Sequence, residues 1–251
     1  MSIFNSFNKA RSTNFKKFAV LIDPDDIKLN EIDALLDLAH NAKVDYFFVG
    51  GSLMVENKLD DCLKAIKSNS NIPCILFPGS PSQINNRADG ILLLSLVSGR
   101  NAELLIGKHV EAAPALKRSN LEIISTSYLL IDGGAQTTAS YISGTTPIPA
   151  DKPEIAACTA MAAEMLGLST IYLDAGSGAV NPISTQLIKQ VKQATNSPII
   201  VGGGVRNPQK AYDNCIAGAD VQVIGNAIEK DPVLITEMAH AIHSASVVIP
   251  E

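Results

Sequence analysis

Residues 170–208 read TIYLDAGSGAVNPISTQLIKQVKQATNSPIIVGGGVRNP, and this stretch decides the fold. An apolar run ends in small and polar residues at Gly176, a helical segment follows, and a second apolar run ends in glycines at Gly203. A strand, a helix and a second strand in this order are typical of a parallel sheet with helices packed on it. The rest of the chain repeats this unit.

Short runs rich in Val, Ile, Leu and Phe recur about every thirty residues, and each ends in glycine or a polar residue. They are nearly continuous apolar segments, as expected for strands covered on both faces. Eight such strands alternating with helices over 251 residues predict a closed (β/α)8 TIM barrel. We expect one domain, 1–251, with 1–17 as an N-terminal extension; a doubly wound open sheet is the alternative. The predicted strands are 18–23, 45–50, 74–79, 90–95, 127–132, 170–176, 198–203 and 221–226.

The segments between the strands carry helical signals. Two apolar stripes have helical spacing and predict helix faces packed on the barrel: Leu29, Ile32, Leu35, Leu36 and Ala39, and then Ile155, Cys158, Ala162, Met165 and Leu166. A capping side chain followed by proline predicts four helix starts, at Ser80-Pro81, Asn181-Pro182, Asn207-Pro208 and Asp231-Pro232. The segment from Gly79 to Asp89 has room for barely two turns, so we expect the helix after the third strand to be reduced to a loop.

Composition limits the function classes. Hydrophobic residues make up 46% of the chain and charged residues 18%, so a large core can form. Twenty basic residues against 25 acidic ones give a net charge of −5, which argues against a nucleic-acid binder and favours small-molecule partners. No apolar stretch approaches the roughly 18 residues of a spanning helix, and residues 1–17 lack the apolar region of a secretory signal. We therefore expect a cytoplasmic protein with free thiols at its four scattered cysteines.

In a TIM barrel the functional groups lie at the carboxyl ends of the strands. Gly203 and Gly204 follow the seventh predicted strand, and Gly225 with Asn226 follows the eighth. Barrels of this type often bind a phosphate there on backbone N–H groups, and glycine lets the oxygens approach the amides. These four residues therefore predict a phosphate site.

The loop after the sixth strand carries a phenol, a carboxylate, a hydroxyl and two glycines. Alternation along a strand puts Tyr172 and Asp174 on the same side, where they can grip a hydroxyl group of a ligand. They are the candidate catalytic residues. The candidate binding segment is Tyr172, Leu173, Asp174, Ala175, Gly176, Ser177 and Gly178. The alternative is that the carboxylate caps the next helix. The polar connection from Gly133 to Ala150 is expected to be an active-site loop.

Three acids follow the first strand in Asp23-Pro24-Asp25-Asp26. Carboxylates and hydroxyls are the hard oxygen ligands that Mg²⁺ prefers, and the ion usually keeps water and substrate phosphates in its shell. Asp23 at the strand end is the predicted first ligand, and Ser52 in the adjacent loop is the second. Asp25 and Asp26 alternatively cap the following helix.

Eight short sequence motifs occur along the chain in this order: LIDPDD, FFVGGS, FPGS, SYLLIDGG, KPEIAACTAMAAEMLG, YLDAGSGA, IIVGGGVRNPQKA and VIGNAIE. As an ordered set they resemble the geranylgeranylglyceryl phosphate synthases and their heptaprenylglyceryl phosphate synthase relatives. The resemblance runs from about Phe18 to Asp231, and it is closest to the longer chains with a YLxAGSG loop. Many relatives carry glutamate at the position of Asp174, so the carboxylate of this chain is shorter by a methylene group.

The resemblance implies a prenyltransferase that joins the C3 hydroxyl of sn-glycerol 1-phosphate to an allylic prenyl diphosphate, foremost geranylgeranyl diphosphate. The product is an ether lipid precursor, and diphosphate is released. By position, Asp23 and Ser52 would hold Mg²⁺, the 172–178 segment with Gly203, Gly204, Gly225 and Asn226 would hold the glycerol phosphate, and Asp174 would act on the attacking hydroxyl.

Three further expectations follow from that activity. The prenyl tail needs an apolar groove, which the small residues from Pro78 to Ser82 and Tyr128 can leave beside the barrel. A lipid substrate implies peripheral contact with a membrane, and barrels of this type commonly form homo-oligomers. The alternative functions keep the phosphate site: a barrel enzyme for flavin mononucleotide or a sugar phosphate, or a non-catalytic protein that binds a phosphate ligand.

Overall fold

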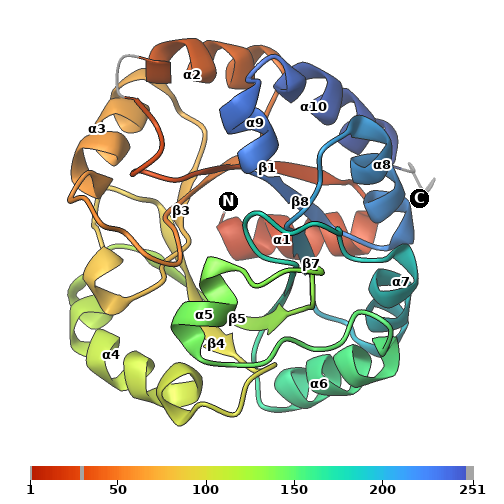
Figure 1. Cartoon of the computed structure of the whole chain (residues 1–251). Coiled ribbons are helices and arrows are strands. Elements are labelled where there is room, and N and C mark those ends of the chain that lie inside the picture. Colours follow the sequence, from red (N-terminus) through yellow and green to blue (C-terminus); the bar gives the residue numbers. More distant parts are fainter. Residues whose placement is uncertain (1, 29–30, 247–251) are drawn as a thin grey trace.

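The computed structural model describes residues 2–28 and 31–246. Its strands form one closed barrel in the order β1 to β8, and all neighbouring strands are parallel. The TIM barrel predicted from the sequence is thereby confirmed, and the open sheet is excluded (Figure 1). The strands are β1 Lys17–Ile22, β2 Tyr46–Val49, β3 Cys74–Leu76, β4 Gly90–Leu96, β5 Glu122–Leu130, β6 Thr170–Asp174, β7 Ile199–Gly202 and β8 Val221–Ile224.

Helices surround the barrel (Figure 1). They are α1 Ile3–Thr13, α2 Ile32–Asn41, α3 Leu59–Asn69, α4 Lys108–Arg118, α5 Thr138–Ser143, α6 Pro153–Met165, α7 Thr185–Ala194, α8 Pro208–Ala217, α9 Asn226–Lys230 and α10 Leu234–Ser244. Between β3 and β4 there is only the 3₁₀ turn Pro81–Gln83, so the prediction of a reduced helix there is confirmed. In the part of the chain that the structure describes, none of the helices is both long enough and apolar enough to cross a bilayer.

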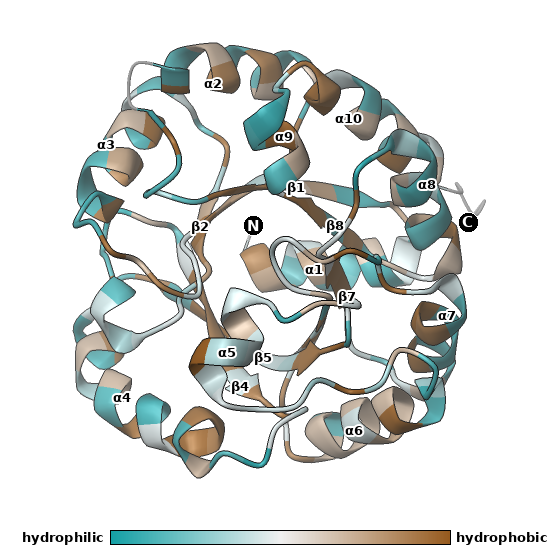
Figure 2. Ribbon diagram, in the orientation of Figure 1, coloured by the Kyte–Doolittle hydropathy of each residue, from teal (hydrophilic) through white to brown (hydrophobic). Residues whose placement is uncertain are grey.

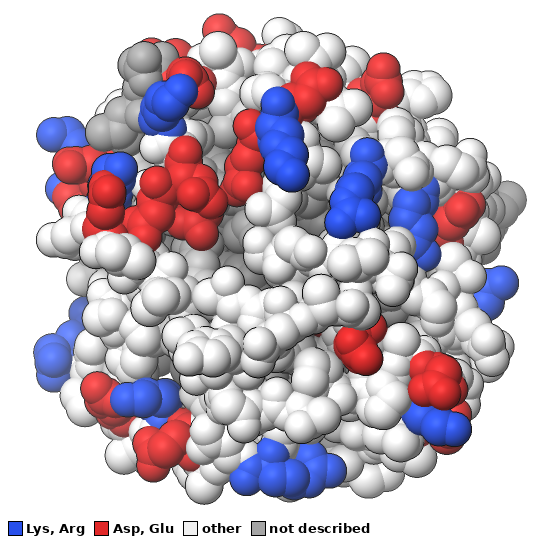
Figure 3. Space-filling model, in the orientation of Figure 1, with Lys and Arg blue, Asp and Glu red and all other residues white. Residues whose placement is uncertain are grey.

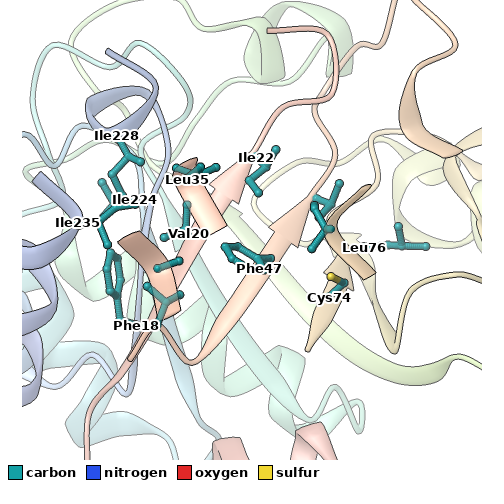
Figure 4. Packing of buried hydrophobic residues seen from close by; sticks show 14 of the residues in the cluster. Phe18, Val20, Ile22, Leu35, Phe47, Cys74, Leu76, Ile224, Ile228 and Ile235 are labelled. Atoms are coloured by element: carbon teal, nitrogen blue, oxygen red, sulfur yellow. The ribbon is translucent and has the colours of Figure 1, made fainter. Parts of the chain in front are cut away.

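Alternation along β1 divides its side chains between two apolar layers. Phe18, Val20 and Ile22 point outward and pack under α2 and α10, in a cluster that also contains Phe47, Ile224 and Ile235 (Figure 4). Ala19 belongs instead to the cluster inside the barrel. Because both faces are covered, the strands are mostly apolar, whereas most of the helices mix apolar and polar residues (Figure 2).

Helix α1 closes the amino-terminal end of the barrel and is seen behind the strands in Figure 1. Its residues Ile3, Phe7 and Ala10 are buried, and the Phe7 ring contacts Tyr46 edge to face with 5.2 Å between centroids. The Glu122 carboxylate at the start of β5 accepts hydrogen bonds from the N–H groups of Ile3 (2.6 Å) and Phe4 (2.8 Å). A carboxylate at the first N–H groups of a helix is favourable. The segment that the sequence identified only as an extension therefore forms part of the core.

The same end of the barrel holds a buried cluster of charges around Asp220, whose side chain is fully buried. Its carboxylate lies 2.9 Å from the Lys192 ammonium, 3.7 Å from that of Lys16 and 3.8 Å from the Arg11 guanidinium. It also accepts the backbone N–H of Ile199 at 3.0 Å. Burial lowers the pKa of Lys16, and the attraction of Asp220 offsets part of that change. One carboxylate thus joins α1, β7 and α7.

The first predicted stripe is confirmed for Ile32, Leu35, Leu36 and Ala39, all buried in α2, whereas Leu29 lies outside the described residues. The second stripe is wrong. In α6 the buried residues are Pro153, Ala156, Ala157, Ala160 and Ala163. Ile155, Cys158, Ala162, Met165 and Leu166 are exposed. The helix is apolar on both faces, so the hydrophobic pattern alone did not select the side that packs, and the alanine face packs on the barrel.

The capping signals have mixed outcomes. Asn207 caps α8 as predicted, because its side chain accepts the N–H of Lys210 at 2.8 Å. Ser80-Pro81 begins the 3₁₀ turn. No helix starts at Asn181-Pro182: α7 begins at Thr185, and Asn181 N–H instead donates to the carbonyl of Gly133 at 2.9 Å. Asp231-Pro232 is also wrong as a start, since α10 begins at Leu234.

We expect Asp220→Asn to lower the free energy of unfolding by about 3 kcal/mol, because it leaves the buried Lys16 ammonium and the half-buried Arg11 and Lys192 without their carboxylate. Chemical denaturation monitored by circular dichroism measures the change. The control is Asp60→Asn, which breaks an exposed ion pair with Arg87 and should change stability little. Equal stability of the two variants would contradict this role of Asp220.

Candidate active site

A polar cavity opens at the carboxyl ends of the strands, on the side where α5 and α9 cover the barrel in Figure 1. Asp23 reaches it from the end of β1 and Ser52 from the loop after β2, and the opposite wall comes from the ends of β6, β7 and β8. The structure therefore brings together ten of the residues predicted from the sequence. They are Asp23, Ser52, Tyr172, Asp174, Ser177, Gly178, Gly203, Gly204, Gly225 and Asn226.

Three residues of the predicted binding segment do not line this cavity. Leu173 points the other way, into the outer apolar layer under α6 and α7, because side chains alternate along β6. Ala175 is buried in that same layer. Gly176 contributes through its backbone N–H, which donates to the Asp174 carboxylate at 2.8 Å. The side chains of Leu173 and Ala175 do not line the cavity, and a binding role for these two residues stays a prediction.

Asp174 is 6% exposed, and both of its carboxylate oxygens have protein partners. The Tyr128 hydroxyl donates to Oδ2 at 2.5 Å, and the N–H of Gly176 donates to Oδ1 at 2.8 Å. Burial raises the pKa of Asp174, and these two hydrogen bonds, which favour the charged form, offset part of the rise. The result is a carboxylate with raised basicity, held in one orientation at the wall of the cavity.

Gly203 lies directly against this carboxylate. Its φ of +82° suits glycine, and a Cβ at this position would be 2.6 Å from Asp174 Oδ1. Arg206, a few residues further on, donates to the carbonyls of Ala179 (2.5 Å) and Val180 (3.0 Å) and so ties the loops after β6 and β7 together. From the β8 side, the Asn226 side chain accepts the Ser177 hydroxyl at 2.9 Å. The loops after β6, β7 and β8 thus form one connected wall.

The opposite wall is acidic. Asp23 and Asp26 line the cavity there, and Figure 3 shows acidic side chains gathered next to α3 on this face. Glu229 of α9 joins this wall to Asn226, whose side chain donates to it at 3.1 Å. Burial raises the pKa of Asp23, its hydrogen bond from the Asp25 N–H (3.0 Å) lowers it, and the charges of Asp26 and Asp25 raise it further. Asp25 itself accepts the N–H of Val55 at 2.6 Å and so fastens the loop after β2.

This wall fits a magnesium ion that retains water or substrate ligands. Within the described residues no three His, Cys, Asp or Glu side chains are grouped closely enough to hold a metal unaided. Asp23 uses Oδ1 for the Asp25 N–H, and its Oδ2 lies beside Gly51, where a Cβ would be 2.6 Å away. A carboxylate and the Ser52 hydroxyl at one edge of a polar cavity are a donor set that Mg²⁺ accepts when phosphates complete its shell.

An apolar groove adjoins the polar cavity, and the two share Gly51, Ser52 and Phe77. It is lined by the 3₁₀ turn, by α4 and by side chains from both faces of β4, Leu93 on the outer face and Leu94 on the inner one. The Phe77 ring stacks on Tyr172 with 5.0 Å between centroids and 6° between planes. Helix α5 lies across both spaces, since Thr138 lines the polar cavity while Ala139 and Ile142 line the groove. The prediction that the 133–150 connection borders the site is confirmed.

The comparisons with known proteins agree with this geometry. The model of the PcrB family matches residues 11–246. This chain belongs to the PcrB family. It is 57% identical over 247 residues to the geranylgeranylglyceryl phosphate synthase of Chitinophaga pinensis, which covers 98% of both chains. It is 53% identical over 227 residues to the synthase of the same name from Spirosoma linguale, covering 90% of this chain and 91% of the relative.

The fold also matches a solved member of this group. The crystal structure of (S)-3-O-geranylgeranylglyceryl phosphate synthase from Thermoplasma acidophilum in complex with sn-glycerol-1-phosphate superposes with a TM-score of 0.91 at 31% identity. The match covers 97% of this chain and 99% of that chain. The resemblance seen in the ordered sequence segments is therefore confirmed over nearly the whole PcrB-family barrel.

Sequence reasoning missed several residues of the site. Phe77 was passed over as a strand residue, although it lines both cavities and its ring stacks on Tyr172. Arg206 and Glu229 carry charge close to the predicted loops, but nothing in their spacing identifies what they contact. Tyr128 was assigned to the groove, and its hydrogen bond to a residue 46 positions away depends on the pairing of β5 with β6.

We expect Gly203→Ala to weaken binding of inorganic phosphate by this PcrB-family protein, because the added methyl group displaces the Asp174 carboxylate and the adjoining loop. Isothermal titration calorimetry measures the loss, which we expect to exceed about tenfold. Gly167→Ala is the matched control: its φ of +89° is equally left-handed, but nothing lies within 4 Å of its Cβ position. Similar phosphate binding by both variants would argue against a phosphate site at Gly203.

Proposed function

We propose that this protein joins the C3 hydroxyl of sn-glycerol 1-phosphate to an allylic prenyl diphosphate, foremost geranylgeranyl diphosphate, and releases diphosphate. The observation that carries the proposal is that a polar cavity and an apolar groove meet at Gly51, Ser52 and Phe77. One reactant is small and polar and the other is a long hydrocarbon with a charged end, so the reaction needs two such spaces with a common border. The names of the relatives support the same activity.

Glycerol phosphate belongs in the polar cavity with its phosphate at Gly203, Gly204, Gly225 and Asn226. The glycine-rich ends of β7 and β8 let phosphate oxygens approach backbone N–H groups. In this position the free hydroxyls of the glycerol face Tyr172 and Asp174. Holding the phosphate fixes the hydroxyl beside the carbon that it attacks, which removes much of the entropic cost of bringing two reactants together.

The diphosphate of the second substrate belongs at the acidic wall, where Asp23 and Ser52 would hold Mg²⁺. When bound, Mg²⁺ supplies positive charge that stabilises the negative charge developing on the leaving diphosphate. Without a cation, the three carboxylates of Asp23, Asp26 and Glu229 would repel an anionic group. The prenyl chain then extends from this border into the apolar groove, along Leu94 and Leu104.

Asp174 accepts the proton of the attacking C3 hydroxyl. As the new C–O bond forms at the allylic carbon and the bond to diphosphate breaks, the hydroxyl proton passes to the carboxylate. The raised pKa of Asp174 that results from burial strengthens it as a base. Tyr172, whose ring is held by stacking on Phe77, orients the hydroxyl.

The apolar groove favours this activity over the flavin and sugar-phosphate alternatives, because neither ligand carries a long hydrocarbon.

Homo-oligomer formation, peripheral membrane contact and a cytoplasmic location stay predictions. The exposed side chains of Ile155 and Met165 on α6, and of Leu166 directly after it, give a second copy of the chain an apolar surface on which to pack. Tyr141 and Ile142 are exposed on α5, beside the groove.

The activity is tested by incubating the protein with radiolabelled sn-glycerol 1-phosphate, Mg²⁺ and prenyl diphosphates of graded length. We expect label to enter a product that partitions into organic solvent, and the best donor identifies the chain length. The sn-glycerol 3-phosphate isomer and EDTA are the controls. If folded protein transfers no label from any of the donors, the proposed function is wrong.

We expect Asp23→Asn to reduce this transfer about 100-fold or more, because it removes the charge that holds the metal against the leaving group. Binding of Mn²⁺, followed by electron paramagnetic resonance, should weaken in parallel and gives a readout that does not depend on turnover. Asp151→Asn, at an exposed position outside both cavities, is the control. Normal Mn²⁺ binding by Asp23→Asn would place the metal elsewhere.

A further inference from the structure

Tyr128 occupies the boundary between the two substrate spaces. Its ring lines the apolar groove, whereas its hydroxyl donates to Asp174, which lines the polar cavity. The ring is fixed by two aromatic neighbours, with centroid distances of 5.4 Å to Tyr172 and 6.0 Å to Phe77. Tyr128 is therefore a rigid group that connects the groove to the carboxylate.

The pairing of β5 with β6 sets this contact. Tyr128 lies opposite Tyr172 in the register, and Leu130 lies opposite Asp174. The phenol therefore reaches diagonally along the inner face of the barrel, two residues toward the carboxyl end. A diagonal neighbour on the same face is within reach of a tyrosine side chain, and a shift of the register by one residue would turn the phenol to the outer face.

We propose that Tyr128 is the positioning residue for Asp174 in the transfer reaction. Its hydrogen bond to Oδ2 and the Gly176 N–H bond to Oδ1 hold the carboxylate at two points. A carboxylate has about four lone-pair sites, so about two are left to accept the substrate hydroxyl. The inference rests on the proposed function, in which Asp174 accepts that proton.

The short side chain of Asp174 makes such support necessary. An aspartate has less reach than a glutamate, so its position depends more strictly on the groups that hold it. A misplacement of about 1 Å at a reacting group can cost about 100-fold in rate. The Tyr128 hydroxyl, on the neighbouring strand β5, fixes the Asp174 carboxylate by its hydrogen bond at the border where the two reactants meet.

The test is Tyr128→Phe, which removes the hydroxyl and keeps the ring. We expect kcat to fall about 100-fold with KM for both substrates within about threefold of the original, because the groove and the phosphate site remain intact. Tyr46→Phe is the matched control, since it deletes a hydroxyl that contacts Ser6 at the other end of the barrel. Thermal unfolding of both variants establishes that each is folded.

A double-mutant cycle separates positioning from packing. If Tyr128 acts through Asp174, the double variant Tyr128→Phe/Asp174→Asn should be no slower than Asp174→Asn alone. If the fold-decrease in kcat of the double variant instead equals the product of the decreases in the two single variants, the proposal is overturned. A Tyr128→Phe variant with the original kcat would overturn it as well.

Titration of the carboxyl group tests the contact without any turnover. The titratable groups that face Asp174 are the phenols of Tyr128 on β5 and Tyr172 on β6, and burial raises the pKa of both. Tyr128→Phe removes a hydrogen bond to the charged form, so the pKa of Asp174, followed by ¹³C NMR of labelled carboxyl groups, should rise. The acid limb of the kcat profile should move to higher pH with it.

These readouts distinguish the two possible failures. A protein without transfer activity would contradict the proposed function, and the NMR titration would still test the Tyr128 contact. An active protein whose Asp174 titrates identically in the original chain and in Tyr128→Phe would overturn the positioning role alone.

Discussion

The position of the Asp174 carboxylate is the constraint on which the rest of the site depends. It is held by Tyr128 from β5 and by the N–H of Gly176 from its own loop. Gly203, directly after β7, has no side chain, and this lets the loop after β7 lie against the carboxylate. Each contact follows from the parallel register of β5, β6 and β7. A closed barrel fixes this register, because no strand can slide without breaking its pairing on both sides.

Charge separates the two ends of the polar cavity. Asp23 and Asp26 line it at the end of β1, whereas Gly203, Gly204 and Arg206 line it after β7. Glu229 of α9 accepts a hydrogen bond from the Asn226 side chain at 3.1 Å and lies between the two. A phosphate without a metal is therefore favoured at the glycine end and repelled from the acidic end, while a diphosphate with its cation is favoured at the acidic end. The apolar groove opens at Ser52, on the acidic side. The charge at the end of β1 and the position of the groove together support the proposed place of each substrate.

The sequence predicted the barrel because each strand is an apolar run that ends in glycine or a polar residue. The positions of those strand ends also located most of the site, since in a barrel they meet at one end. The choice of packing face in α6 failed because alanine packs closely although it is weakly hydrophobic. The role of α1 was missed, although Ile3, Phe7 and Ala10 have helical spacing, because the rest of that segment is polar. The link from Tyr128 to Asp174 spans 46 residues, so only the paired strands reveal it.

A crystal structure of the protein with sn-glycerol 1-phosphate tests the central claim most directly, because it shows which end of the cavity receives the phosphate. The account predicts the phosphate at Gly203, Gly204, Gly225 and Asn226, with the C3 hydroxyl within hydrogen-bond distance of Asp174. A phosphate bound instead beside Asp23 and Ser52, or a glycerol that points away from Asp174, would contradict it.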